Sequence, residues 1–220
     1  MKILIHACPQ RMWYVEGFLV PQLRAQGADD IEIWNDTARR GNLLACMDSF
    51  RSRTGDGGTW HLQDDVLPCR DFVQRAEKED EGLVNGFCCP NFGDDVLTCG
   101  RVYPPDAWHS FQCVRIPDPW ARECAEWYFS GAWHESPSDE LPLLEEAGKG
   151  DDSFFHEFFE LRHPYDMAKN LCPNLVEHVD WLLGGSVLHS WRDYLPRAYY
   201  WSDDKLVAEL KEQLRGRVPD

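Results

Sequence analysis

KILIHA at residues 2–7 contains the apolar run Ile3-Leu4-Ile5, as expected for a β-strand that is covered on both faces. Pro9 ends this run, and residues 15–26 then carry apolar side chains at helical spacing up to Gly27, a favourable residue at the end of a helix. The alternation continues with predicted helices at residues 42–50 and 71–81 and predicted strands at residues 31–34, 59–62 and 82–89. Such alternation predicts an α/β fold, a mainly parallel sheet flanked by helices on both faces.

The second half of the chain is less regular, because prolines separate short segments that are rich in aromatic residues. Residues 119–130 can hold a helix, and residues 131–150 are predicted to form a long loop, a kind of segment that often has a function. Two further helices are predicted, at residues 151–161 after an aspartate cap and at residues 203–214. We find no repeat and no linker, so we expect one domain over residues 1–220.

Charge and hydropathy limit the classes of protein. The 220 residues carry a formal net charge of −16, which repels a phosphate backbone and disfavours general nucleic-acid binding. A phosphate-bearing ligand would then require local cations, such as a metal ion. No segment approaches the roughly 20 apolar residues of a membrane span, and the apolar start of the chain is too short for a signal peptide. We therefore expect a cytoplasmic protein with no membrane partner.

The chain has nine cysteines and no Cys-x-x-Cys pair. Zinc ribbons and thioredoxin-like sites need that spacing, so both are disfavoured. Because the count is odd and the expected compartment is reducing, we expect all nine cysteines to be free thiols.

The strongest local feature is Gln63-Asp64-Asp65, which follows the strand predicted at residues 59–62. Open α/β sheets bind ligands at the carboxyl ends of their strands. Neighbouring residues of a strand point to opposite faces, so only one of the two carboxylates can face a given metal ion. The alternative is that both aspartates are solvated loop residues that cap the helix behind them.

Three other segments carry candidate residues. Asp151 and Asp152 stand at the start of a predicted helix, where a carboxylate could accept a proton from a hydroxyl or merely cap the helix. His178 lies between apolar residues and could be either a ligand or a histidine of the core. His189 is the other candidate for the ligand role. Arg39-Arg40-Gly41-Asn42 could face a diphosphate or a base, or form a solvated loop.

These features, in this order, resemble the GT-A glycosyltransferases over about residues 1–190. The resemblance implies a nucleotide-sugar-binding half at about residues 1–90, an acceptor and catalytic half at about 91–200, and a C-terminal helix. It makes Asp65 and His178 ligands of Mn²⁺ or Mg²⁺, although the first position of the family's Asp-x-Asp motif is Gln63 here. It makes Asp152 the catalytic base, with Asp151 beside it. The implied nucleotide-sugar contacts are His6, Ala7, Pro9, Arg11, Asp36, Arg40, Asn42, Gln63 and Asp64.

The resemblance implies an inverting, metal-dependent transfer of a sugar from a nucleotide sugar, with UDP as the expected carrier. The acceptor stays open between a glycan, a protein side chain and a modified nucleobase. We place it near Trp108-His109 and residues 127–133, because flat aromatic faces stack on sugars and bases. The pattern also resembles that of short phage or prophage proteins of this class.

Two other functions stay open at this point. A metal-dependent phosphohydrolase or nuclease would use Asp64, Asp65, Asp151 and Asp152 around two metal ions. A carbohydrate-binding module without catalytic activity would use the aromatic residues and would need no nucleotide.

Overall fold

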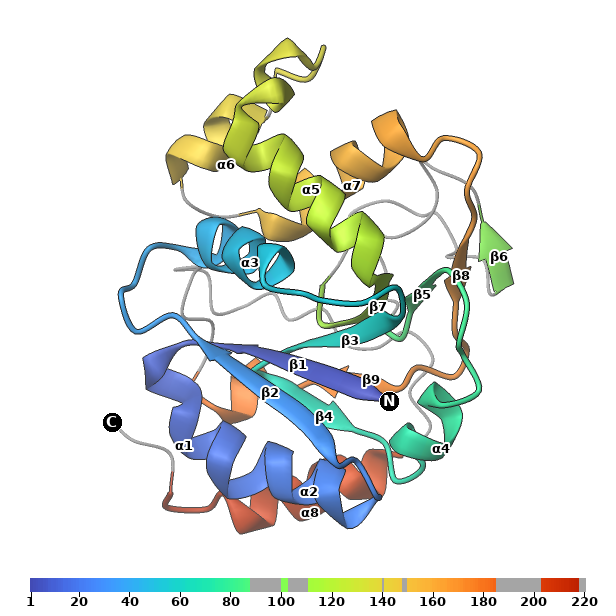
Figure 1. The fold of residues 1–220 in the computed structure, drawn as a ribbon. Helices are drawn as coiled ribbons and strands as arrows, with labels where there is room; N and C mark the ends of the chain where they lie inside the picture. The colour runs from blue at the N-terminus through green and yellow to red at the C-terminus, as the bar shows by residue number, and fades with distance from the viewer. Residues whose placement is uncertain (88–99, 103–110, 140, 148–149, 185–202, 218–220) are drawn as a thin grey trace.

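A seven-stranded sheet forms the centre of the computed structural model, which describes residues 1–87, 100–102, 111–139, 141–147, 150–184 and 203–217 (Figure 1). The strand order is β2-β1-β3-β7-β5-β8-β6. The strands are β1 (Lys2–Ala7), β2 (Asp30–Asn35), β3 (Gly58–Gln63), β5 (Leu83–Asn85), β6 (Gly100–Val102), β7 (Cys113–Pro117) and β8 (Ala168–Asn170). Only β6 and β7 run against the other five. The predicted α/β fold with a mainly parallel sheet is confirmed.

The first half of the sheet is the part that the sequence predicted best. β1 lies between β2 and β3 and pairs in parallel with both. The helical segment after β1 begins at Pro9 rather than at residue 15, and it contains α1 (Met12–Tyr14), a π-helical stretch at Val15–Leu19 and α2 (Val20–Ala25). It ends at Gly27, whose φ of 97° is a conformation that glycine adopts without steric cost.

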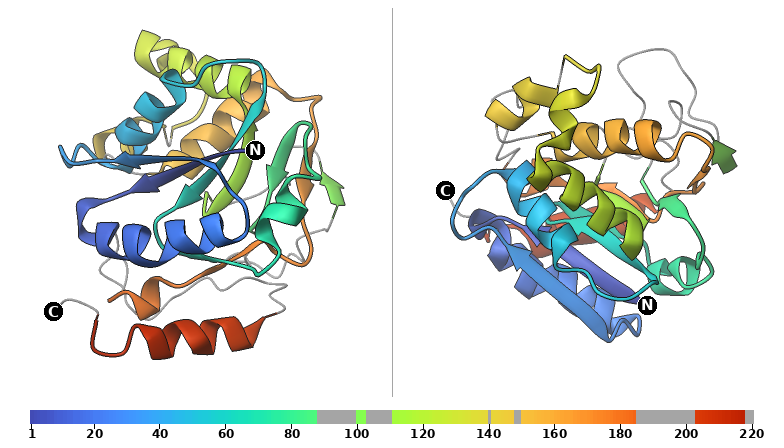
Figure 2. Two further views of the ribbon diagram at one scale, coloured as in Figure 1. Left: turned by 60° about the horizontal axis from the view of Figure 1, so that its bottom comes forward. Right: turned by 45° about the horizontal axis from the view of Figure 1, so that its top comes forward.

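The two faces of the sheet carry different helices (Figures 1 and 2). The helices are α3 (Asn42–Arg51), α5 (Asp118–Ser130), α6 (Leu141–Ala147) and α7 (Asp151–Arg162) on one face, and α1, α2, α4 (Phe72–Ala76) and α8 (Asp204–Gln213) on the other. The α7 side buries four phenylalanines of α7 completely. Each such side chain contributes about 1.5–3 kcal/mol relative to an exposed one. The opposite side packs Leu206, Val207 and Leu210 of α8 into one core with Ile3 and Ile5.

A second, two-stranded sheet was not predicted. β4 (Val66–Pro68) pairs antiparallel with β9 (Val176–His178), and Val66 lies opposite His178. The hydroxyl of Tyr14 donates a hydrogen bond to the carbonyl oxygen of Val66 at 2.9 Å, which ties this small sheet to α1. Residues that are far apart in the chain thereby meet just beyond the end of β3.

Several predicted boundaries were wrong. Residues 131–150 are not a long loop, because they contain a 3-10 turn at Ala132–Glu135 and α6. Trp133 and Leu141 anchor this segment, with exposures of 4% and 1%. α7 is not capped by an aspartate side chain, since Gly150 occupies the cap position and no side-chain cap bond forms. The helix predicted at residues 71–81 shortens to α4, and the strand predicted at 82–89 shortens to β5 within the described residues.

The expectation of nine free thiols was wrong. Cys172 is disulfide-bonded. The other five cysteines within the described part of the chain are free. An odd count and the lack of a Cys-x-x-Cys pair do not exclude a bond between distant cysteines, because tertiary contacts bring them together. Among the described helices, none is long and apolar enough to cross a bilayer.

Candidate functional site

A cavity of about 240 Å³ opens at the carboxyl ends of β1 and β3. We call it the cleft. It is lined by His6, Ala7, Cys8, Pro9, Gln10, Arg11, Asp36, Arg39, Gly41, Asn42, Gln63, Asp64 and Asp65. Each of these residues lies in or after β1, β2 or β3, which run parallel, so their carboxyl ends meet at one edge of the sheet.

The cleft brings together eight of the nine residues that the resemblance implied for nucleotide-sugar binding, and also Asp65. The exception is Arg40, whose guanidinium contacts Asp48 at 2.5 Å and Asp36 at 3.7 Å instead. Its neighbour Arg39 lines the cleft. Arg39 has a φ of 52° and Gly41 a φ of 96°, and the backbone N–H of Gly41 donates to Asp36 at 3.2 Å. This tight turn decides which of the two arginines reaches the cleft.

Asp64 is held by the backbone after β1. The N–H of Cys8 donates to its Oδ2 atom at 2.7 Å. Burial raises the pKa of the Asp64 carboxyl, and the negative charge of Asp65 raises it further, against the opposing effect of Arg11. Burial and Asp64 together also raise the pKa of the Cys8 thiol to about 12, so Cys8 is a protonated thiol at neutral pH.

Asp65 is the centre of a buried ion-pair group. Its Oδ2 atom lies 3.2 Å from Nε2 of His178 and 3.3 Å from Nη1 of Arg11. Burial alone would raise the pKa of Asp65, but His178 and then Arg11 outweigh it and lower the pKa. Asp180 lies 3.9 Å from the same His178 nitrogen. The predicted proximity of Asp65 and His178 is confirmed, while the assignment of both as metal ligands stays a prediction.

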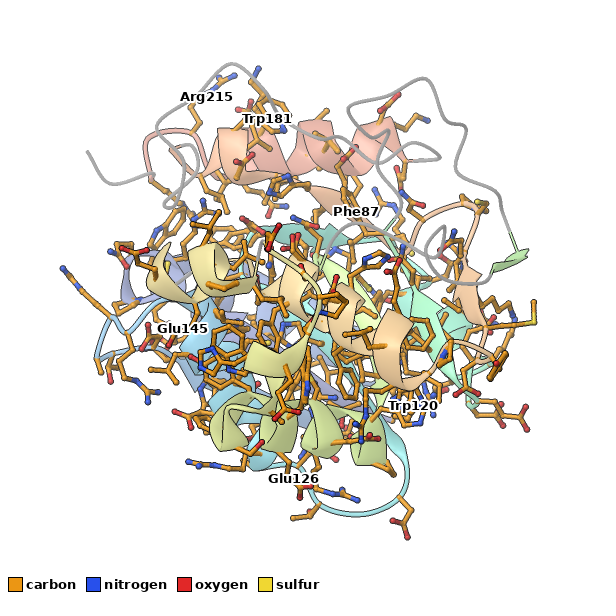
Figure 3. The ribbon with its side chains drawn as sticks, turned by 90° about the horizontal axis from the view of Figure 1, so that it is seen from above. Phe87, Trp120, Glu126, Glu145, Trp181 and Arg215 are labelled. Atoms are coloured by element: carbon orange, nitrogen blue, oxygen red, sulfur yellow. The ribbon has the colours of Figure 1, made fainter. Side chains whose placement is uncertain are left out.

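β9 and the residue after it hold His178 in this position. The backbone N–H of Val179 donates to the carbonyl oxygen of Asp65 at 2.8 Å. The ring of Phe87, which is labelled in Figure 3 and is completely buried, packs edge-on against His178 with centroids 6.2 Å apart. His178 is only 7% exposed, so its ring orientation is fixed by packing as well as by charge.

A second polar group lies in the core next to the cleft. One potential ligand atom from each of His6, Cys46, His61 and Asp151 lies within 4.8 Å of the others, and we call these residues the buried cluster. His6 belongs to both regions. Burial lowers the pKa of His6 to about 4 and lowers that of His61 well below its usual value, so both imidazoles are neutral at pH 7.

Asp151 and Asp152 therefore lie in different surroundings. Asp151 is 2% exposed, and its Oδ1 atom accepts a hydrogen bond at 2.7 Å from Asn42, which lines the cleft. Burial and the charge of Asp152 raise the pKa of Asp151. Asp152 is half-buried at the start of α7, and its Oδ1 atom accepts from the N–H of Ser153 at 2.8 Å.

Two of the aromatic residues predicted to bind the acceptor are core residues, whereas Phe129 is 38% exposed. Trp127 is 9% exposed and Trp133 is 4% exposed, and both pack against Phe154. Their large apolar surfaces fill the space between α5 and α7. Trp108, His109 and His189 lie outside the described residues.

Sequence reasoning gave no ligand role to Cys46, His61 and Asp180, and of the pair Arg39-Arg40 it chose Arg40 as the nucleotide contact, whereas Arg39 lines the cleft. A signal for His61 was present, because this histidine lies within the apolar strand predicted at residues 59–62. For Asp180 the signal was its spacing from His178.

Three solved structures are similar to this chain in overall fold, at low sequence identity. The glycosyltransferase GlyE of Streptococcus pneumoniae is 13% identical with a TM-score of 0.46, over 99% of this chain and 52% of GlyE. A197 from STIV is 14% identical with a TM-score of 0.42, over 81% of this chain and 85% of that one. The nucleoside-diphosphate-sugar pyrophosphorylase of Vibrio cholerae is 11% identical with a TM-score of 0.44, over 81% of this chain and 76% of that one.

This chain thus spans about half of the length of GlyE. No protein-family model matches the sequence. No curated protein sequence matches it either. We therefore base the functional proposal on the geometry of the cleft.

Proposed function

We propose that the protein is an inverting glycosyltransferase that moves a sugar from a nucleoside-diphosphate sugar, with UDP as the expected carrier, to an acceptor hydroxyl. The observation that supports this most is the composition of the cleft. Residues implied for nucleotide-sugar binding from sequence alone surround one cavity at the carboxyl ends of three parallel strands. Ligands of open α/β sheets bind at that edge.

The charges of the cleft suit a diphosphate. The chain has a net charge of −16, yet Arg11 and Arg39 both line this cavity. The carboxylates of Asp36 and Asp64 can accept hydrogen bonds from a base, a ribose or a sugar. A nucleotide sugar carries phosphates, which bind to cations, and many hydroxyl groups, which donate hydrogen bonds to carboxylates. The cleft offers both kinds of group side by side.

Asp65 and His178 would hold the divalent metal ion. Oδ2 of Asp65 and Nε2 of His178 lie 3.2 Å apart, so one divalent ion could be held by both atoms. Oxygen with one imidazole suits Mn²⁺ better than Mg²⁺. When bound, such an ion neutralises charge on the leaving diphosphate. Arg11 contacts the same Oδ2 atom, so Arg11 and a metal ion compete for it.

Asp152 would act on the acceptor. Its carboxylate takes the proton of the acceptor hydroxyl while that oxygen forms a bond to the anomeric carbon. The bond from the anomeric carbon to the diphosphate oxygen breaks on the opposite side, and its electron pair leaves with the diphosphate. A single displacement inverts the configuration, as in inverting glycosidases. Asp151 is less suited to this role because it is buried and bonded to Asn42.

The hydrolase alternative finds less support in the geometry. It requires Asp64, Asp65, Asp151 and Asp152 around two metal ions. Among the described residues, the one group of at least three potential ligands contains Asp151 but neither Asp64 nor Asp65. The carboxylates are instead divided between the cleft and the buried cluster.

Calorimetry with UDP, with and without Mn²⁺, tests the proposal. We expect UDP to bind only in the presence of Mn²⁺, and Asp65→Asn to weaken that binding at least about tenfold, or 1.4 kcal/mol. Asp48→Asn is the matched control, because it removes a carboxylate of α3 that does not line the cleft. Mn²⁺-independent binding of UDP would contradict the metal assignment. Absence of UDP binding together with binding of free sugars would favour the carbohydrate-binding module.

A further inference from the structure

The buried cluster is assembled from four separate elements. His6 comes from β1, Cys46 from α3, His61 from β3 and Asp151 from α7. In the parallel register of β1 and β3, Leu4 lies opposite His61, so His6, two residues further along, is on the same face of the sheet as His61. That face is the one covered by α3 and α7 (Figure 1).

The cluster contains polar atoms without partners. Both ring nitrogens of His61 and Oδ2 of Asp151 are buried and have no hydrogen-bond partner in the described structure. His61 is 0% exposed and Asp151 is 2% exposed. Buried polar groups are nearly always bonded, and an unbonded one is destabilising. Two unbonded imidazole nitrogens and a carboxylate oxygen in one place therefore point to a missing ligand.

The spacing of the atoms suits a small tetrahedral ion. Zinc binds nitrogen at about 2.0–2.1 Å and thiolate sulfur at about 2.3 Å, which places the ligands of a tetrahedral site with one thiolate about 3.3–3.6 Å apart. The four candidate atoms already lie within 4.8 Å of one another. Rotamer adjustments of about 1 Å would close this distance without a change of fold.

We propose that His6, Cys46, His61 and Asp151 bind one Zn²⁺ ion in the core of the protein, beneath the cleft. The charges balance, because two neutral imidazoles, a thiolate and a carboxylate together neutralise a doubly positive ion. Binding releases to solvent the thiol proton of Cys46 and any proton held by the carboxyl group of Asp151. Because all four positions are filled by the protein, the ion has a structural role rather than an open catalytic position.

The surroundings orient these ligands. Asn42 donates to Oδ1 of Asp151 at 2.7 Å, which leaves Oδ2 directed to the ion. The rings of Phe50 and Phe111 lie 5.9 and 5.2 Å from the ring of His61, so the site is shielded from water on that side. His6, which is 8% exposed and lines the cleft, gives the ion a path of entry.

The proposed zinc ion differs in chemistry from the metal ion proposed for the cleft. Thiolate and imidazole ligands in a tetrahedron select zinc, whereas the carboxylates of the cleft suit Mn²⁺ or Mg²⁺. The two proposed metal sites share no ligand, since the ion of the cleft is assigned to Asp65 and His178, although His6 lines the cleft as well as belonging to the buried cluster.

Metal analysis and cobalt substitution of the purified, full-length protein test this proposal. We expect about one equivalent of zinc per chain. After replacement by Co²⁺ we expect the absorption of a tetrahedral cobalt ion together with a thiolate-to-cobalt charge-transfer band. At zinc concentrations about a thousandfold above Kd, the melting temperature should rise by about 8–16 °C. A protein that takes up no zinc, or an octahedral cobalt spectrum without the thiolate band, would overturn the proposal.

Matched variants identify the ligands. Cys46→Ala should abolish the charge-transfer band, whereas Cys124→Ala should retain it, because Cys124 is an equally buried thiol that packs against Met47 instead. His61→Leu should melt no lower than the wild type in the presence of a chelator, since it removes two unpartnered nitrogens. It should also lose the stabilisation by zinc. Retention of the thiolate band by Cys46→Ala would show that another cysteine holds the ion.

Discussion

The cleft and the buried cluster are two polar regions that share His6 and are linked by the hydrogen bond from Asn42 to Asp151, yet they are built in opposite ways. In the cleft, Asp65 has two positively charged or chargeable neighbours within 3.3 Å, and Asp64 accepts a backbone N–H. In the cluster, His61 has no hydrogen-bond partner among the described residues, and one oxygen of Asp151 has none.

This difference indicates what each region requires from a ligand. An open cavity whose charges already compensate one another can exchange an internal contact for a contact with an incoming molecule. A closed group of unsatisfied atoms gains most from a ligand that stays, because burial without partners is destabilising. The first arrangement suits a substrate that comes and goes, and the second suits a permanent ion.

The largest expected effect separates the two neighbouring aspartates of α7. Asp152→Asn keeps the shape of the side chain but removes its basicity, so we expect the rate of sugar transfer to fall about 10²–10⁴-fold. UDP affinity should stay within a few-fold, because little ground-state binding is lost. Turnover and UDP calorimetry measure both quantities. If turnover stays near normal, Asp152 is only a residue of the first turn of α7, and the division between a catalytic Asp152 and a structural Asp151 does not hold.

A smaller effect is expected on the free energy of unfolding when an ion pair of Asp65 in the cleft is removed. Arg11→Met keeps the apolar stem of a side chain that is 3% exposed but removes the guanidinium from Asp65. Breaking one contact of a buried ion pair costs about 3–5 kcal/mol, and we expect about 3 because His178 still contacts Asp65. Urea unfolding measures the free energy. A loss below about 1 kcal/mol would indicate that the charges of the cleft do not compensate one another as the geometry suggests.

The smallest effect is expected at the arginine that the turn directs away from the cleft. Arg40→Met removes exposed ion pairs with Asp36 and Asp48, and such pairs contribute about 0–1 kcal/mol. UDP affinity should change less than in Arg39→Met, since Arg39 lines the cleft. Calorimetry of the two variants side by side decides this. A larger loss of affinity in Arg40→Met would restore the interpretation drawn from the sequence.

The sequence predicted those helices and strands whose own residues show a clear apolar pattern. β1, α3 and α7 have long or strongly periodic patterns, and their positions agree with the prediction within a residue or two. β6 and β8 have three residues each, too few for a period to appear. β4 and β9 exist only as a pair, so neither half shows a local signal.

The same limit applies to the two polar regions. Most of the cleft lies directly after strands, where topology alone brings residues together, and it was predicted well. The buried cluster depends on the rotation of α3 and α7 above the sheet, which places Cys46 and Asp151 beside His61. Backbone detail also decides single residues, since the positive φ angles of Arg39 and Gly41 select one arginine over its neighbour. Spacing in the sequence contains neither kind of information.

The pairing of β4 with β9 has a consequence for synthesis on the ribosome. Asp65 and His178 are separated by 113 positions in the chain. At roughly 5–20 residues per second, a nascent chain waits about 6–23 s between the two. During that interval Arg11 and Asp65 have been made, but the imidazole and the Val179 amide that hold Asp65 have not. The growing chain thus carries its first three parallel strands well before it can complete the place where a ligand would bind.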